Sequence, residues 1–233
     1  MIKIENISIH GLEETIRGMR NPMNSWDKSD SGICKGGDDG IGCENCAKEV
    51  PCEHTYDHSF QLGKADHELM MKLAAGGPVH AKYRRMITVY LDITAPLYWW
   101  KEFDTYKVGT VANSCSTMHK IQAKEFTLED FSCEHLNSAS IKVLKNIILE
   151  LNVNRNGFNN HSINEVGLEN HKAYWWQMIQ LLPSSYNQKR TVMLNYEVLV
   201  GIYRWRKEHK LDEWREFCQW IEQLPYSEII TSA

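Results

Sequence analysis

The sequence lacks the features that mark several large functional classes. No apolar run approaches the roughly 20 residues that a membrane-spanning helix needs. The first residues, MIKIENISIHG, have no basic stretch followed by an apolar core, so no secretory signal is predicted. No glycine-rich phosphate loop follows a predicted strand, which argues against a Rossmann or P-loop enzyme. A net charge of −4 predicts neither general affinity for large nucleic acids nor a role at a membrane surface.

What the sequence does contain is typical of one large globular domain. Its 233 residues are enough for one buried core, and 42% of them are hydrophobic. Eight tryptophans and ten tyrosines supply large side chains, most of which we expect in the core or at an interface. We therefore expect a single cytoplasmic domain that covers residues 1–233.

The periodicity of apolar residues predicts an α+β fold, with a mixed or antiparallel sheet packed against long helices. We expect strands over 2–11 and 86–93. We expect a turn over 108–114, a helix that opens after Thr127, and a polar loop over 152–167. A short helix is predicted over 12–20, and further helices are predicted over 65–77, 96–107, 139–152, 173–183, 190–210 and 213–225.

Four of the seven cysteines lie in a glycine-rich segment over 25–60, which is predicted to be an irregular insert. The odd number of cysteines and the missing signal favour reduced thiols over a disulfide framework. Four thiolates at this spacing could hold a structural zinc ion, which would supply the folding energy of so polar a segment. An iron–sulfur cluster and an unligated surface loop are the alternatives, and His54 or His58 could replace one ligand. The predicted ligands are Cys34, Cys43, Cys46 and Cys52.

Two stretches of the chain carry a more specific pattern. The first, over 105–119, reads TYKVGTVANSCSTMH and contains Lys107, Asn113 and Ser116. The second has a Leu-Pro dipeptide at 182–183 and then a helical pattern with Asn195 and Arg206. Together they resemble the flavin-dependent thymidylate synthases of the ThyX type, in which a signature of the form RHRxxSxNExSxRY precedes a Leu-Pro dipeptide, an Asn and a later Arg.

The resemblance also extends upstream, because IRGMRNPMNSW is similar to the early Arg-Ser segment of that family. It implies reductive methylation of dUMP with FAD as the hydride carrier, a folate as the carbon donor and a homotetrameric assembly. It implies Ser116 as the catalytic residue near the uracil edge. The implied cofactor-binding residues are Asn195, Lys107, Asn113 and Arg85, and the implied substrate-binding residues are Arg206, Ser116, His119 and Arg190.

Several positions depart from the family's signature. Thr105 and Tyr106 stand where the family has Arg and His, Ser114 replaces its Glu, and its late Arg falls on Met118 or His119. Nucleotide phosphates need fixed cations, and a lysine does not reproduce the planar two-pronged contact of arginine. Arg190 or Arg204 would therefore have to supply the missing charge.

Two other functions fit parts of the pattern. The chain could be a non-catalytic protein that binds a nucleotide or a protein partner on the same fold. A zinc-dependent nucleotide deaminase fits less well, because Gly42 precedes Cys43-x-x-Cys46 where that chemistry needs a proline. Cys115 lacks a neighbouring cation that would favour its thiolate, so we do not expect it to act as a nucleophile.

Overall fold

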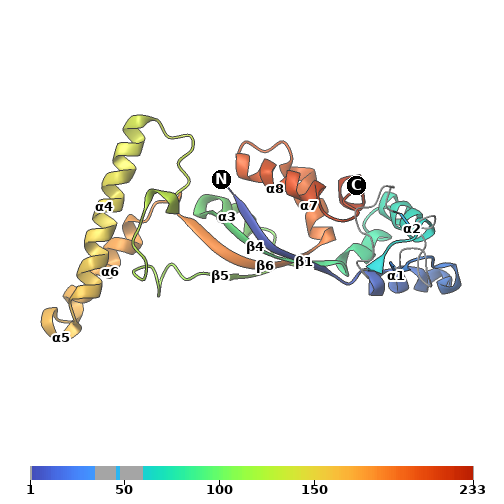
Figure 1. Ribbon diagram of the computed structural model, residues 1–233, viewed down its shortest axis with the longest axis horizontal. Coiled ribbons are helices and arrows are strands. Elements are labelled where there is room, and N and C mark those ends of the chain that lie inside the picture. The colour runs from blue at the N-terminus through green and yellow to red at the C-terminus, as the bar shows by residue number, and fades with distance from the viewer. Residues whose placement is uncertain (1, 35–45, 48–59, 233) are drawn as a thin grey trace. The chain divides into compact units, whose positions relative to one another are not determined.

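The computed structural model describes residues 2–34, 46–47 and 60–232 (Figure 1). The fold is α+β, as the periodicity predicts, with a four-stranded sheet of order β1-β4-β6-β5. The chain divides into two compact units, which are described separately below. One unit comprises residues 1–6, 91–107 and 111–192, and the other comprises residues 7–90, 108–110 and 193–233.

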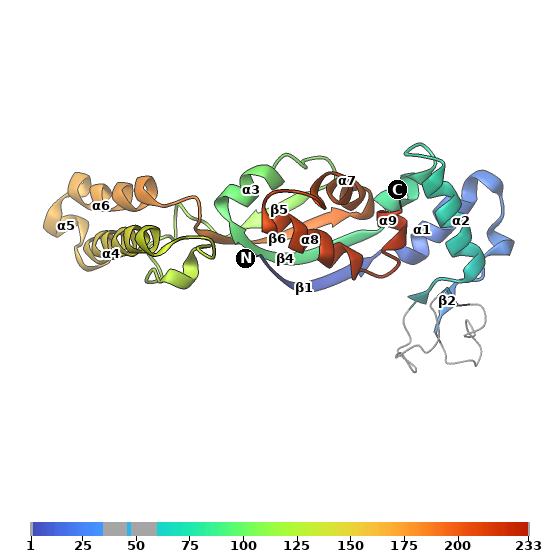
Figure 2. The same ribbon diagram turned by 90° about the horizontal axis from the view of Figure 1, so that it is seen from above.

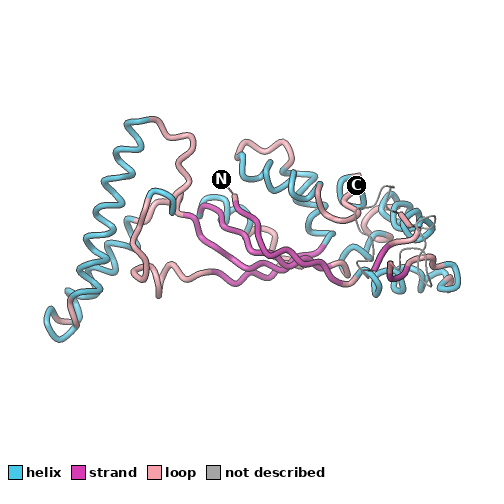
Figure 3. Tube along the Cα trace, viewed as in Figure 1, coloured by secondary structure: helices cyan, strands magenta, loops and turns pink. Residues whose placement is uncertain are grey.

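Six strands are present in the described part of the chain (Figure 3). The four-stranded sheet consists of β1 (Lys3–His10), β4 (Thr88–Pro96), β5 (Val111–Ser114) and β6 (Asn187–Asn195). The short strands β2 (Gly32–Ile33) and β3 (Phe60–Gln61) form an antiparallel pair in which Gly32 lies opposite Gln61.

The alternation of buried residues explains why the central strands form. In β4 the buried residues Val89, Leu91, Ile93 and Ala95 recur with the period of two that a one-sided strand requires. In β6 the buried residues are Gln188, Val192 and Leu194. All four residues of the edge strand β5 are exposed, so it has no apolar periodicity of its own.

The first unit contains a pair of packed helices. The long helix α4 and the helix α6 lie side by side in both views (Figures 1 and 2). The helices of this unit are α3 (Leu97–Phe103), α4 (Ser138–Asn160), α5 (Ile163–Val166) and α6 (Leu168–Leu181), with a 3-10 turn, η4, at Leu128–Asp130. The core between α4, α6 and the segment before α4 consists of Ile121, Phe126, Phe131, Leu144, Ile148, Leu151 and Met178.

The second unit has its own helices and a core rich in large side chains. Its α-helices are α1 (Leu12–Arg20), α2 (Lys64–Ala75), α7 (Tyr196–Arg206), α8 (Asp212–Glu222) and α9 (Glu228–Thr231). In the described part of this unit, three 3-10 helices accompany them, η1 (Asn21–Met23), η2 (Trp26–Lys28) and η3 (Ala81–Arg85). Its fully buried side chains include Leu62, Met70, Ile87, Tyr196, Trp214 and Phe217.

A buried ion pair joins α1 to α2 in this unit. Arg20 donates from Nε to Oδ1 of Asp66 at 2.6 Å, and both side chains are at least 95% buried. Oδ2 of Asp66 accepts hydrogen bonds from the hydroxyls of Ser29 and Ser31, each at 2.7 Å, and from the backbone amides of Asp30 and Ser31. The Asp66 carboxylate therefore fixes the segment that leads into β2.

Several local predictions are wrong, and the reasons are structural. The predicted helix over 190–210 is a strand to Asn195 and a helix from Tyr196, because Val192 and Leu194 face the core with strand period. The polar residues over 152–160 continue α4, and 163–166 form α5. The predicted turn over 108–114 includes β5, and Thr127 opens only a 3-10 turn closed by a capping box with Asp130.

The remaining predictions concern the insert over 25–60, membrane-spanning helices and the number of domains. Within the predicted insert over 25–60, the described residues form η2 and β2 rather than irregular loop throughout. None of the helices in the described part of the chain is long and apolar enough to cross a membrane. The single-domain organisation predicted from the sequence stays a prediction.

Candidate functional site

Asn195 lies at the point where β6 passes into α7. Its side-chain Oδ1 accepts a hydrogen bond of 3.0 Å from the backbone amide of Val198 and so caps the helix. The next amide, that of Tyr196, donates to the carbonyl of Ile87 and ties this junction to the chain before β4. Among the described residues, the Nδ2 amide group of Asn195 donates no hydrogen bond. The side-chain oxygen thus accepts a hydrogen bond, whereas the side-chain NH2 group has no acceptor among the described residues.

The backbone of Gly109 approaches that open amide closely. Gly109 has φ +77°, a conformation that residues with a side chain rarely adopt. A Cβ atom at this position would lie 2.9 Å from Asn195 Nδ2 and 3.2 Å from Cγ2 of Val198. The next residue, Thr110, has a buried hydroxyl with no hydrogen-bond partner in the described part of the chain. We call Gly109, Thr110 and Asn195 the amide corner.

Two neighbouring basic residues before β4 differ in burial and in contacts. Arg84 and Arg85 both lie in the 3-10 helix η3. Arg84 is 3% exposed and donates from Nε to Oε2 of Glu197 at 2.8 Å. Its Nη1 also donates to the carbonyl of Ile229. Arg84 is therefore structural, whereas Arg85 is exposed and accessible to a ligand.

Arg206 lies in the last turn of α7, half-buried. Its guanidinium sits 4.7 Å from the ring centroid of Trp214, which is fully buried at the start of α8. A cation over an indole face is held by the quadrupole of the ring. The contact fixes the position of this predicted phosphate-binding side chain.

In the other unit, Arg190 is paired within the protein. It donates from Nη1 to Oδ1 of Asp104 at 2.7 Å and from Nε to Oε1 of Gln188 at 3.0 Å. Its guanidinium also lies 4.2 Å from the ring centroid of the buried Trp100. The charge of Arg190 is therefore balanced by a carboxylate, which weakens its attraction for a phosphate.

The remaining predicted site residues of this unit are exposed on its surface. Lys107 and Asn113 are exposed, and Asn113 belongs to β5. The Ser116 hydroxyl oxygen accepts hydrogen bonds from the backbone amides of Met118 and His119, at 3.2 and 2.9 Å. Ser116 thus shapes a local turn, as short hydroxyl side chains commonly do, and its hydroxyl hydrogen is left to donate. The His119 side chain is exposed.

Sequence reasoning did not single out Gly109 or Thr110. A glycine in the segment KVGTVANS indicated a turn, but nothing local indicated that its backbone meets a residue 86 positions later. The positive φ and the contact with Asn195 are properties of the tertiary structure. A glycine between two β-branched residues was the one available signal.

The predicted zinc ligands are only partly described. Cys43 and Cys52 lie outside the described residues, and no group of three or more His, Cys, Asp or Glu that could hold a metal occurs within them. Cys34 directly follows β2, and Cys46 lies opposite Gly63 in an antiparallel bridge, so both flank the segment over 60–63. Both are free thiols. The zinc site stays a prediction.

We expect metal analysis of the purified protein to find about one zinc per chain, as a site with four thiolate ligands binds one ion. Cys43→Ser should lower this content and make the protein more sensitive to chelators, because three ligands hold zinc less tightly. The control is Cys115→Ser, which removes an exposed thiol outside the predicted set and should leave the metal content unchanged. Metal-free protein from a zinc-supplemented preparation would contradict the prediction.

Comparisons with known proteins give a fold but no family. No protein-family model and no curated protein matches the chain. Crystal structures do match: one of the flavin-dependent thymidylate synthase ThyX from Helicobacter pylori with FAD and dUMP is 14% identical, with a TM-score of 0.60, over 98% of this chain and 97% of that chain. A second structure of that enzyme with the same ligands is also 14% identical, with a TM-score of 0.58, over 99% of this chain and 97% of that chain. At this identity the likeness establishes that the fold is ThyX-like.

Proposed function

We propose that the protein binds FAD and a pyrimidine nucleotide and acts as a thymidylate synthase-like enzyme, methylating dUMP or a related nucleotide reductively. The observation that carries this proposal is the amide corner, where an open side-chain amide and a buried, unpartnered hydroxyl lie beside a backbone that only glycine fits. The similar structures bind FAD and dUMP on the same fold. A folate donor and a homotetramer stay predictions of the resemblance.

The residues of the amide corner fit a flavin. A buried polar group without a partner costs about 1–3 kcal/mol, so Thr110 is expected to hydrogen-bond a ligand. The pyrimidine-like edge of a flavin presents carbonyl oxygens and an N–H group, which match the Asn195 Nδ2 donor and the Thr110 hydroxyl. When bound, FAD would supply the hydride of the reaction, and the protein would supply placement.

The other roles follow from charge and exposure. We propose Arg206 as the phosphate-binding residue, because its guanidinium is held in place by Trp214. Ser116 keeps a hydroxyl hydrogen and is proposed to contact the substrate base. Arg85, Lys107 and Asn113 are exposed candidates for cofactor binding, and His119 and Arg190 are candidates for substrate binding.

The sharpest test is Asn195→Asp. Aspartate caps a helix as well as asparagine does, so the bond from Val198 and the stability of α7 should be kept. The substitution removes the Nδ2 donor and adds a negative charge beside Gly109. We expect FAD to bind at least about tenfold more weakly, as a lost hydrogen bond to a ligand implies. Flavin absorbance retained after gel filtration measures the effect.

A matched control is available at another helix. Asn137 caps α4 in the same way, with Oδ1 accepting from the backbone amide of Ser140 at 2.9 Å. Asn137→Asp should leave flavin retention unchanged. Equal FAD affinity in wild-type protein and Asn195→Asp would remove the amide corner from the proposal. Complete loss of FAD from the wild-type protein at high concentration would overturn the proposed enzyme.

One observation favours a second function. Arg190, which would have to replace a missing phosphate-binding cation, is already paired with Asp104. The chain could therefore be a non-catalytic protein that binds a nucleotide, or a protein partner, on the same fold. A colourless protein that binds dUMP in calorimetry would support nucleotide binding without catalysis. Perturbation of bound-flavin absorbance by dUMP would support the enzyme.

A further inference from the structure

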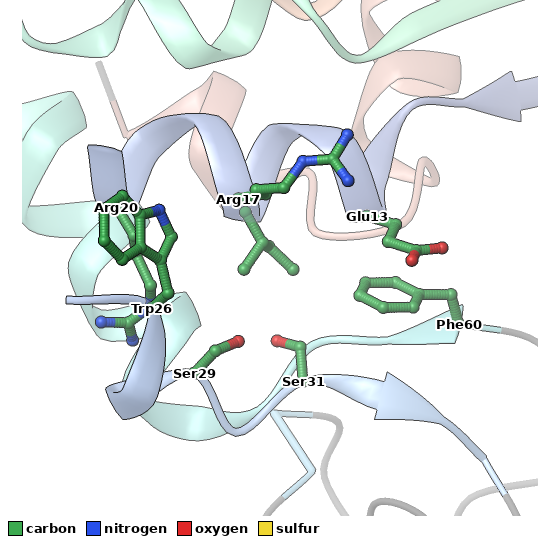
Figure 4. Close-up of a pocket in the computed structure, with 8 residues that line it drawn as sticks. Glu13, Arg17, Arg20, Trp26, Ser29, Ser31 and Phe60 are labelled. Carbon is green, nitrogen blue, oxygen red and sulfur yellow. The ribbon is translucent and has the colours of Figure 1, made fainter. Parts of the chain in front are cut away.

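A cavity of about 230 Å³ lies between α1 and the segment that leads into β2 (Figure 4). It belongs to the second unit and includes none of the residues proposed for FAD or nucleotide binding. The cavity is large enough for a small molecule of the size of an amino acid. Its lining residues are Glu13, Ile16, Arg17, Arg20, Trp26, Ser29, Ser31 and Phe60.

The ends of the cavity are aromatic. Trp26 and Phe60 stand on opposite sides of it in Figure 4. Trp26 is 50% exposed, yet its ring is fixed, because Nε1 donates to Oδ1 of Asn21 at 2.8 Å. Ile16, which is 4% exposed, adds an apolar contact. A fixed, half-exposed indole facing an aromatic ring across a cavity suits a planar apolar group.

The side of the cavity opposite α1 offers hydrogen-bond acceptors. The hydroxyls of Ser29 and Ser31 both donate to Asp66, so their hydrogens are committed. Ser31 Oγ accepts one bond, from the amide of Gly63, and Ser29 Oγ accepts none in the described part of the chain. Each oxygen therefore keeps a lone pair. A ligand group at this side should carry an N–H or O–H donor.

The α1 side carries one charge of each sign. Glu13 and Arg17 lie one turn apart on α1, both are exposed, and both line the cavity. Residues at this spacing often form an ion pair. Neither side chain forms an ion pair or hydrogen bond with any described residue. Arg20 also lines the cavity, but its charge is balanced by Asp66.

We propose that this cavity binds a free aromatic amino acid whose side chain carries a hydrogen-bond donor, as tyrosine and tryptophan do. The ring lies between Trp26 and Phe60, and its donor bonds a serine oxygen. The ammonium group pairs with Glu13 and the carboxylate pairs with Arg17. An amino acid of this class satisfies both charges, both hydroxyl oxygens and the aromatic walls at once.

The test uses the full-length protein and L-tyrosine as the probe. Tryptophan fluorescence, excited at the red edge where tyrosine does not absorb, should change saturably through Trp26. Tyramine, which lacks the carboxylate, and 3-(4-hydroxyphenyl)propanoate, which lacks the ammonium, should each bind about tenfold more weakly. The variant Trp26→Phe should abolish the change in fluorescence, while calorimetry should still detect binding.

Two charge-removing variants assign the contacts. Arg17→Gln should weaken L-tyrosine about tenfold without affecting tyramine, and Glu13→Gln should weaken L-tyrosine without affecting the propanoate. Both residues are exposed in a helix that glutamine suits, so folding should be kept. The matched control is Glu14→Gln, an exposed neighbour on α1 that does not line this cavity.

Three results would overturn the proposal. The first is the absence of a saturable signal by fluorescence and calorimetry. The second is equal affinity for L-tyrosine, tyramine and the propanoate, which would mean that Glu13 and Arg17 do not contribute to binding. The third is wild-type affinity in both charge variants. None of these results bears on FAD binding, so this proposal and the proposed function can fail independently.

Discussion

Replacing Asp66 with alanine is expected to lower the free energy of unfolding by about 4 kcal/mol, because breaking a buried ion pair strands the remaining charge. The stranded group is Arg20, whose side chain is 5% exposed and whose other bonds go to Ser25. The hydroxyls of Ser29 and Ser31 and two backbone amides lose their acceptor as well. Chemical denaturation monitored by circular dichroism measures the change.

The control for this prediction is Asp27→Ala. Asp27 lies in η2, is exposed and has no hydrogen-bond or ion-pair partner among the described residues. Its removal should change the free energy of unfolding by less than about 0.5 kcal/mol. A loss in Asp66→Ala as small as that of the control would contradict the structural role assigned to the Arg20–Asp66 pair.

The same carboxylate predicts a pH dependence. Burial alone raises the pKa of Asp66, but hydrogen bonds from Ser31, Ser29 and Arg20 outweigh it and hold the pKa below its ordinary value. The stability that follows is present above the unfolded-state pKa of about 3.9 and is lost as the pH falls through the folded-state pKa. Stability of the wild type should therefore fall below about pH 4 more steeply than that of Asp66→Asn. Parallel curves would contradict this.

Replacing Glu197 with alanine is expected to lower the free energy of unfolding by about 3 kcal/mol. The buried guanidinium of Arg84 would keep its bond to the carbonyl of Ile229 but lose its carboxylate. Glu197 also lies in the first turn of α7, where a negative charge favours the helix dipole. Thermal and chemical unfolding measure the loss.

Two variants make this prediction specific. Glu197→Gln keeps an oxygen that can accept from Arg84 Nε, so it should lose less stability than Glu197→Ala. Glu208→Ala removes an exposed carboxylate beyond the end of α7 and should have almost no effect. Equal losses in Glu197→Ala and Glu208→Ala would contradict the prediction that the buried Arg84 depends on its ion pair with Glu197. Because Asn195 caps the same helix, Glu197→Ala should also weaken FAD retention if the proposed function holds.

Local patterns predicted those elements in which one residue type dominates one face. The strand of β4 was readable because every second residue over 89–95 is apolar and buried. The helices α1, α2 and α8 were readable from apolar spacing and from the breaks that follow them. The ThyX-like fold was predicted from motif order alone, and the similar crystal structures confirm it as a fold.

Local patterns gave wrong predictions where the same kind of sequence can form either a helix or another structure. The run over 190–206 is apolar enough for a helix throughout, but its first part pairs within the sheet and its second part begins at the Asn195 cap. Residues over 152–160 are polar because much of that part of α4 faces away from its core, not because it is a loop. The exposed edge strand β5 has no buried face to mark it.

The sequence by itself therefore determined the fold class and most helices, because these follow from the local spacing of apolar residues. The flavin-binding and nucleotide-binding residues stay predictions that the resemblance implies. Only the tertiary structure decided which of those residues are available. It paired Arg84 with Glu197 and Arg190 with Asp104, separations of 113 and 86 positions, and brought Gly109 to Asn195. Contacts of this kind depend on how distant segments pack, and no periodicity within either segment records the partner.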